Sequence, residues 1–373
     1  MDREELYREL SKQTEEMSAG ERMEAYLQGE EVDFQPFGFL SPEDALAHIW
    51  GYTKGEVKRS FEVRQELIRR KKEEYRIEGI GIPLGLRGMA EVMGSKLNYP
   101  EDRVDYVETH VLQDYGDLDA LEEMEIRESP LLLERLEEGK RLLEKFPGME
   151  ISTDCAGPFS TAISVRPIEK VLRDIQREPE KLHRLLRLCV RNSLIWIDMF
   201  YKETGSAAVG IADPVTTSDI LGKKYFQEFS QPYIKELIGG IEKITGQKPS
   251  VHICGHTRKI WDGLMEAGVA NFSIDNCESM EEAKNVMGDR VFLSGNVDPV
   301  DVLQKGTIQD VIQAVKRCLL EGSDNPCGYM LMSGCQVPMG TPRENMDAYI
   351  YAARKYGARA KLGRLPEGLA GEE

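Results

Sequence analysis

Short apolar runs alternate with helical patterns along most of the chain. Runs rich in valine, isoleucine or phenylalanine and bounded by turn residues predict buried strands, and the amphipathic stretches between most of them predict helices. The predicted strands cover 34–40, 79–85, 149–154, 207–212, 250–254, 270–275, 291–295 and 328–333, and the predicted helices include 58–76, 169–177, 179–200, 222–245, 257–267 and 307–322. This alternation of strands and helices predicts an α/β fold of the (β/α)8 TIM barrel type.

The pattern predicts three segments. An N-terminal helical extension is expected at 1–30, a barrel at 31–360 and a flexible tail at 361–373. A doubly wound open sheet shows the same alternation of strands and helices. However, the Gly-x-Gly-x-x-Gly sequence that cradles a dinucleotide does not follow the first predicted strand. The barrel is therefore the preferred fold.

The composition excludes several classes of partner. The 373 residues carry a formal net charge of −17 and 41% of them are hydrophobic, which is typical of globular proteins. Such an acidic chain lacks the dense field of lysine and arginine that nucleic acids and anionic membranes require. No stretch approaches the roughly 18 apolar residues of a membrane span, and the charged N-terminus is unlike a signal peptide, so a cytoplasmic protein is expected. Its seven cysteines are expected to stay reduced.

Two strand ends carry candidate metal ligands. His252 and Cys254 lie two residues apart in the predicted strand 250–254, so they share one face of it. Cys335 follows the last predicted strand. Because the carboxyl ends of barrel strands meet at one face, we expect a His-Cys-Cys set with an open fourth position, as in catalytic zinc sites. The alternatives are cysteines with packing roles and His256 as the imidazole ligand, although its place beyond the strand favours solvent exposure.

Other strand ends carry polar residues, as the mouth of an active site requires. Asp275 and Cys277 are candidates for a fourth metal ligand or for contacts to the ligands, and a helix N-cap is the alternative role for Asp275. Asp298 is interpreted as an N-cap. The residues expected to line a substrate pocket are Arg87, Met89, Cys155, Asp213, Asn296 and Tyr329, and those expected in the core are Cys189 and Cys318.

At these residues the chain resembles the uroporphyrinogen decarboxylase superfamily, and within it the cobalamin-linked methyltransferases of the methylcobamide:coenzyme M type. The resemblance spans roughly 20–358, and its most specific blocks are His252-Ile253-Cys254-Gly255, Asp275, 295–299 and 328–345. It implies a barrel in which His252, Cys254 and Cys335 hold zinc. It also implies transfer of a methyl group between a small molecule and the cobalt of a separate corrinoid protein.

The resemblance further implies that cobalamin is presented by a partner. Corrinoid proteins of such systems carry an Asp-x-His-x-x-Gly motif whose histidine ligates cobalt, and the chain lacks this motif. The small molecule is either a methoxylated aromatic donor, as in aryl methyl ether O-demethylases, or a thiol acceptor such as coenzyme M. The aromatic donor is favoured by methionine and aromatic residues in the predicted pocket segments: Phe37, Phe39, Met89, Met93, Tyr329, Met330, Met332 and Met339.

Two further hypotheses stay open. Decarboxylases of the superfamily bind a porphyrinogen rich in carboxylates through an N-terminal motif of the Arg-Gln-Ala-Gly-Arg type, and they do not use the His-Cys-Cys set. The chain lacks that motif, and Arg87 is the one basic residue in the nearest segment. A uroporphyrinogen-type decarboxylase without metal is therefore the alternative function. A non-catalytic metal-binding or scaffold protein on the same barrel is the third hypothesis.

Overall fold

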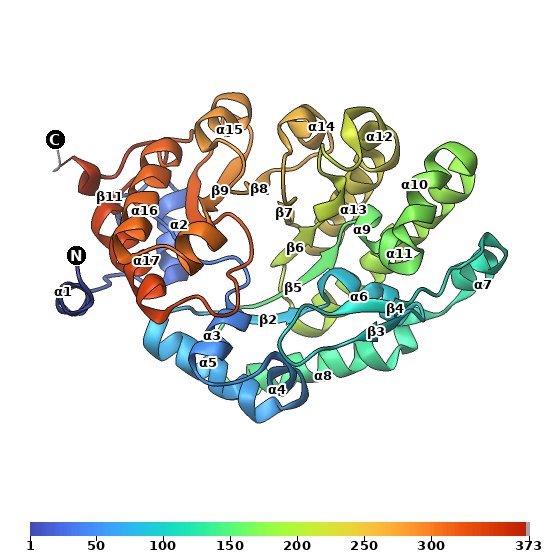
Figure 1. The fold of residues 1–373 in the computed structure, drawn as a ribbon, viewed down its shortest axis with the longest axis horizontal. Helices are drawn as coiled ribbons and strands as arrows, with labels where there is room; N and C mark the ends of the chain where they lie inside the picture. The colour runs from blue at the N-terminus through green and yellow to red at the C-terminus, as the bar shows by residue number, and fades with distance from the viewer. Residues whose placement is uncertain (371–373) are drawn as a thin grey trace. The chain divides into compact units, whose positions relative to one another are not determined.

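Parallel strands followed by helices make up most of the chain (Figure 1). The computed structural model describes residues 1–370. The chain divides into two compact units. The first unit comprises Met1–Val57, Arg69–Ile77 and Asn271–Glu373, and the second comprises Lys58–Ile68 and Glu78–Ala270.

The second unit contains a run of parallel strands. Their hydrogen-bonded order is β2 (Ile80–Pro83), β5 (Ile151–Ala156), β6 (Val209–Ala212) and β7 (Ser250–His252). Burial alternates along the first part of β5, where Ile151 and Thr153 are buried. The indole N–H of the buried Trp196 donates to Thr153 Oγ1 over 3.1 Å, so it holds a long helix against the strands.

The first unit contains a second run of parallel strands, in the order β8 (Asn271–Ser273), β9 (Phe292–Val297) and β10 (Tyr329–Ser333). Both runs lie among helices, which confirms the predicted α/β class. The helices are α1 (Arg3–Leu10), α2 (Ala19–Leu27), α3 (Glu43–Ile49), α4 (Lys54–Arg59), α5 (Phe61–Tyr75), α6 (Gly85–Val92), α7 (Leu118–Glu123), α8 (Pro130–Lys145), α9 (Pro158–Val165), α10 (Ile168–Arg177), α11 (Pro179–Thr204), α12 (Gly222–Phe229), α13 (Gln231–Thr245), α14 (Trp261–Glu266), α15 (Met280–Met287), α16 (Ile308–Gly322) and α17 (Arg343–Tyr356).

The predicted first strand, 34–40, is reduced to a single bridge. Phe37 pairs in parallel with Leu331 of β10 at one position, where the Leu331 N–H donates to the Pro36 carbonyl over 2.9 Å. Pro36 has no N–H of its own, so a regular ladder cannot run through it. The strand that forms nearby, β1 (Val32–Phe34), instead pairs antiparallel with β11 (Ala358–Ala360).

Two other features differ from the sequence pattern. The predicted helix 222–245 is divided into α12 and α13, because Pro232 in the first turn of α13 has no N–H to continue a helix. β3 (Lys96–Asn98) and β4 (Tyr106–Thr109) form an antiparallel pair that was not predicted. Both strands are largely exposed, so they lack the apolar runs that reveal buried strands.

The structure describes regular elements in both terminal segments. α1 and α2 lie within the expected N-terminal extension, 1–30. The expected flexible tail, 361–373, contains a short 3-10 turn at Glu367–Leu369, and 371–373 lie outside the described residues. Of the helices in the described part of the chain, none combines the length and apolar character that a membrane crossing requires.

Tyr329 connects β10 to the last turn of α16 in the first unit. Its ring has no exposed surface, and its hydroxyl donates to the Gly295 carbonyl of β9. A Cβ atom at Gly322 would lie 2.5 Å from the Tyr329 ring. The close approach of α16 to β10 therefore depends on glycine at this position.

We predict that Gly322→Ala lowers the free energy of unfolding by about 1 to 3 kcal/mol, because the buried ring has no space to move away. The matched control is Gly239→Ala in α13, where a Cβ atom would have no neighbour within 4 Å. That change should raise the free energy of unfolding by about 0.5 to 1 kcal/mol through helix propensity. Denaturant unfolding followed by circular dichroism measures both; equal effects would contradict this view of the packing.

Candidate metal centre

The end of β7 carries two metal-type donors side by side. Nε2 of His252 lies 3.2 Å from Sγ of Cys254, so the two-residue spacing places both side chains on one side of the strand end, as predicted. His252 is 9% exposed and Cys254 is partly exposed. Gly255 then turns the chain with a φ of 75°, a conformation that glycine adopts without strain. His256 is exposed, as its position predicted.

The ends of β8 and β10 carry a second pair of donors within the first unit. A carboxylate oxygen of Asp275 and Sγ of Cys335 lie within 4.8 Å of each other. Asp275 is 8% exposed, and Cys335 is partly exposed. The loops that carry them approach closely at Gly334, where a Cβ atom would lie 2.5 Å from the Asn276 nitrogen. Glycine is therefore required there for the pair to form.

Backbone and amide groups fix Asp275. The Cys277 N–H donates to Asp275 Oδ1 over 3.0 Å, and the Asn296 amide donates to the carbonyls of Asp275 and Glu278 over 3.2 and 2.8 Å. Asn296 thus holds the loop of Asp275. Cys277 contacts Asp275 through its backbone, and burial, followed by the charge of Asp275, raises the pKa of its thiol to about 12. Asp298, as predicted, caps a helical turn by accepting from two backbone N–H groups.

The residues predicted to line a pocket differ in their burial and in their contacts. Arg87 of α6 forms an ion pair with Asp105 at 3.7 Å. Met89 and Cys155 are each 1% exposed, and burial raises the pKa of the Cys155 thiol. The Tyr329 ring packs against Gly322, and its hydroxyl donates to the Gly295 carbonyl. The two cysteines expected in the core, Cys189 and Cys318, are buried as predicted.

Asp213 is a fully buried carboxylate at the end of β6. Its Oδ1 accepts from the backbone N–H and the hydroxyl of Ser160, over 2.9 and 2.5 Å. Its Oδ2 is buried without a hydrogen-bond partner among the described residues. Burial raises the pKa of Asp213 to about 6, although the Ser160 and Phe159 donors oppose this rise. The structure therefore holds a carboxyl group that loses its proton less readily than an exposed aspartate.

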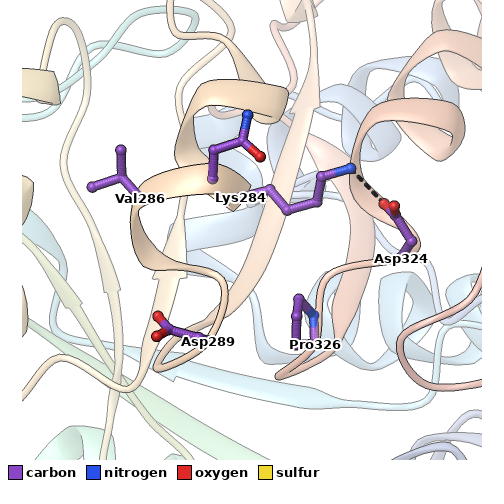
Figure 2. Close-up of a pocket in the computed structure, with 6 residues that line it drawn as sticks. Lys284, Val286, Asp289, Asp324 and Pro326 are labelled. Carbon is purple, nitrogen blue, oxygen red and sulfur yellow. Dashed lines mark hydrogen bonds and ion pairs between the residues drawn. The ribbon is translucent and has the colours of Figure 1, made fainter.

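The structure has two surface depressions that are lined by other residues. The first is lined by Lys284, Asn285, Val286, Asp289, Asp324 and Pro326 and has a volume of about 460 Å³. Figure 2 shows the ion pair between Lys284 and Asp324 in it, 2.5 Å long. The second is lined by Glu180, His183, Arg184, Arg187 and Tyr233 and has a volume of about 500 Å³. Neither contains a predicted site residue, so the strand ends remain the candidate site.

Parallel strands with histidine, cysteine and aspartate donors at their ends define an α/β protein with a candidate metal centre. The chain belongs to the uroporphyrinogen decarboxylase family, because the family model described as "Uroporphyrinogen decarboxylase (URO-D)" matches residues 18–356. The sequence resemblance to this family is thereby confirmed.

Several relatives are methyltransferases. The chain is 25% identical to a methylcobamide:CoM methyltransferase, MtaA, of Methanosarcina barkeri, over 90% of this chain and 98% of that protein. It is 26% identical to a methylated-thiol–coenzyme M methyltransferase of Methanosarcina mazei, over 71% of this chain and 69% of that protein. A solved methyltransferase from Methanosarcina mazei shares the fold, with a TM-score of 0.78 and 24% identity, over 92% of this chain and all of that one. A uroporphyrinogen decarboxylase of Oryza sativa matches 51% of the chain at 25% identity, over 47% of its own length.

We predict that Asp213 makes the stability of the metal-free protein depend on pH. The pKa of an unfolded aspartate is about 3.9, so the folded state binds a proton more tightly than the unfolded state. The free energy of unfolding should therefore fall by about 3 kcal/mol as the pH rises from below 4 to above 6. Asp213→Asn should remove this dependence, whereas Asp219→Asn, at an exposed position, should not. Denaturant midpoints between pH 4 and 7 measure the effect; parallel curves for wild type and Asp213→Asn would contradict the prediction.

Proposed function

We propose that the protein is a zinc-dependent methyltransferase that moves a methyl group between a small molecule and the cobalt of a separate corrinoid protein. The observation that carries this proposal is the presence of metal-type donors at the ends of β7, β8 and β10. His252 and Cys254 make one pair, and Asp275 and Cys335 make the other. We propose that both pairs bind one ion.

The donor chemistry supports zinc. Each of the four residues offers one ligand atom, from one imidazole, two thiols and one carboxylate. Zinc in proteins is bound by nitrogen, sulfur and oxygen donors, and catalytic zinc keeps a position that a substrate can take. We propose His252, Cys254 and Cys335 as the permanent ligands, and Asp275 as the ligand that a substrate replaces. The Cys277 and Asn296 contacts hold the Asp275 loop in place for this exchange.

Bound Zn²⁺ would lower the pKa of a coordinated thiol, or would withdraw charge from an ether oxygen. The chain's own residues would orient the small molecule and exclude water. In β10, Met330 and Met332 are partly exposed, whereas the alternate residues Tyr329 and Leu331 are fully buried. Apolar side chains of this kind suit the flat ring of a methoxylated aromatic compound. Arg87 already pairs with Asp105, so it is a weaker candidate for binding a sulfonate.

The relatives support methyl transfer and a corrinoid partner. One of them is a methylcobamide:CoM methyltransferase, and another is a methylated-thiol–coenzyme M methyltransferase. The chain has no Asp-x-His-x-x-Gly motif of its own, which favours a corrinoid carried by another protein. The alternative, a uroporphyrinogen-type decarboxylase, is supported by relatives that match about half of the chain.

We predict about one zinc ion per purified chain, and its loss in Cys254→Ala and in Cys335→Ala, because each change removes a thiolate ligand. Asp275→Ala should retain zinc with weaker affinity, because the three permanent ligands, His252, Cys254 and Cys335, all remain. The matched control is Cys327→Ala, which removes a partly exposed thiol outside the donor set. Elemental analysis after gel filtration measures the zinc. Full zinc content in Cys335→Ala would refute the proposed ligand set.

We predict that the protein transfers methyl groups both from methoxylated aromatic compounds to a corrinoid protein and from a methylated corrinoid protein to coenzyme M, at different rates. With a reduced corrinoid protein and methoxylated aromatic compounds, the absorption of methylcobalamin should appear. With a methylated corrinoid protein and coenzyme M, that absorption should disappear more slowly. Cys335→Ala should lose at least a hundredfold in rate in both assays, and Cys327→Ala should not. Decarboxylation of a porphyrinogen in the absence of metal, with no methyl transfer, would instead establish the alternative function.

A further inference from the structure

The loop that follows β6 contacts the loop that carries the first pair of metal-type donors. This second loop begins at His252 and ends at His256, and both loops belong to the second unit. We propose that the β6 loop, residues 213–218, positions the His252–Cys254 pair for the metal, and that Thr217 is its principal positioning residue. This inference rests on the proposed function and extends it to the residues that hold the ligands in place.

Hydrogen bonds from the β6 loop fix both ends of the ligand loop. The Asp213 N–H donates to the His252 carbonyl over 3.0 Å. At the other end, the Ser218 N–H donates to the His256 carbonyl over 2.8 Å, and the Thr217 hydroxyl donates to the same carbonyl over 2.7 Å. Cys254 lies midway between these two anchors. Its position is therefore set from both directions along the chain.

Thr217 also contacts the turn directly after Cys254. Gly255 has a φ of 75°, and a Cβ atom at this position would lie 3.2 Å from Thr217 Oγ1. The hydroxyl thus packs against the glycine turn as well as donating to the carbonyl that follows it. Thr217 is 6% exposed, so water cannot readily replace its hydroxyl. Losing this group would remove a contact that supports the turn from the side.

The β6 loop is itself held firmly. Asp213 Oδ1 accepts from the Ser160 N–H and hydroxyl in the first turn of α9. The Thr216 hydroxyl donates to the Asp213 carbonyl over 2.8 Å. The first turn of α9 therefore fixes the loop, and the loop in turn fixes the ligand pair. Contacts beyond the ligands typically change metal affinity 10- to 100-fold when they are removed.

The test compares Thr217→Val, which removes the hydroxyl at nearly constant volume, with Thr217→Ser, which retains it. The control is Thr245→Val, because Thr245 is also buried and its hydroxyl donates to the Ile241 carbonyl at the end of α13, not to the ligand loop. Each metal-free protein is titrated with Co²⁺, and the thiolate-to-cobalt absorption reports the affinity and the geometry of the bound ion. Circular dichroism verifies that each variant is folded.

Thr217→Val should weaken Co²⁺ binding about 10- to 100-fold and alter the cobalt absorption, whereas Thr217→Ser and Thr245→Val should stay within about threefold of wild type. Wild-type affinity and spectrum in Thr217→Val would overturn the inference. If the wild type binds neither Co²⁺ nor Zn²⁺, the proposed function fails, and amide hydrogen exchange in the metal-free protein then decides the inference separately. Faster exchange at 254–257 in Thr217→Val than in Thr245→Val supports it, and equal exchange overturns it.

Discussion

Parallel pairing of the strands determines where the candidate ligands lie in each unit. In the second unit the register of β5, β6 and β7 places the ends of these strands at one edge, and in the first unit the register of β8, β9 and β10 does the same. Side chains that follow the carboxyl ends of parallel strands lie at the edge of the sheet where α/β proteins place their active-site residues. The donors at 252, 254, 275 and 335 all lie at such ends.

Backbone groups of neighbouring residues take part in fixing the candidate ligands. Asp275 accepts from the Cys277 N–H, and the carbonyl of His252 accepts from Asp213. An amide N–H has no lone pair to offer a metal, so these groups hold the ligand residues without competing for the ion. Asp213 adds a cost, since burial raises the pKa of its carboxyl to about 6. The free energy lost by burying this group is offset elsewhere in the fold, as is common at functional sites.

The sequence predicted those parts of the molecule that depend on local pattern. The buried strands followed from short apolar runs bounded by turn residues. The proximity of His252 and Cys254 followed from their two-residue spacing, because a strand end places alternate residues on one face. The exposed β3 and β4 strands carry no such signal, and the bridge at Phe37 depends on contacts far along the chain. The roles of Ser160 and Thr217 were missed for the same reason: each is one of many hydroxyl residues, and only the fold brings it to Asp213 or His256. Tyr329 was expected to line a pocket because it is an aromatic residue in a predicted pocket segment. Its ring is instead buried against Gly322 of α16, a contact that the sequence does not reveal.

The proposed function requires that two donor pairs from different strand ends bind a single zinc ion. X-ray absorption at the zinc edge of the purified protein counts the atoms around the metal. We expect two sulfur ligands at about 2.3 Å and two nitrogen or oxygen ligands at about 2.0 to 2.1 Å. The same spectrum of Asp275→Ala, which should retain zinc, should still show two sulfurs. A shell of oxygen and nitrogen alone, or of four sulfurs, would rule out the proposed ligand set.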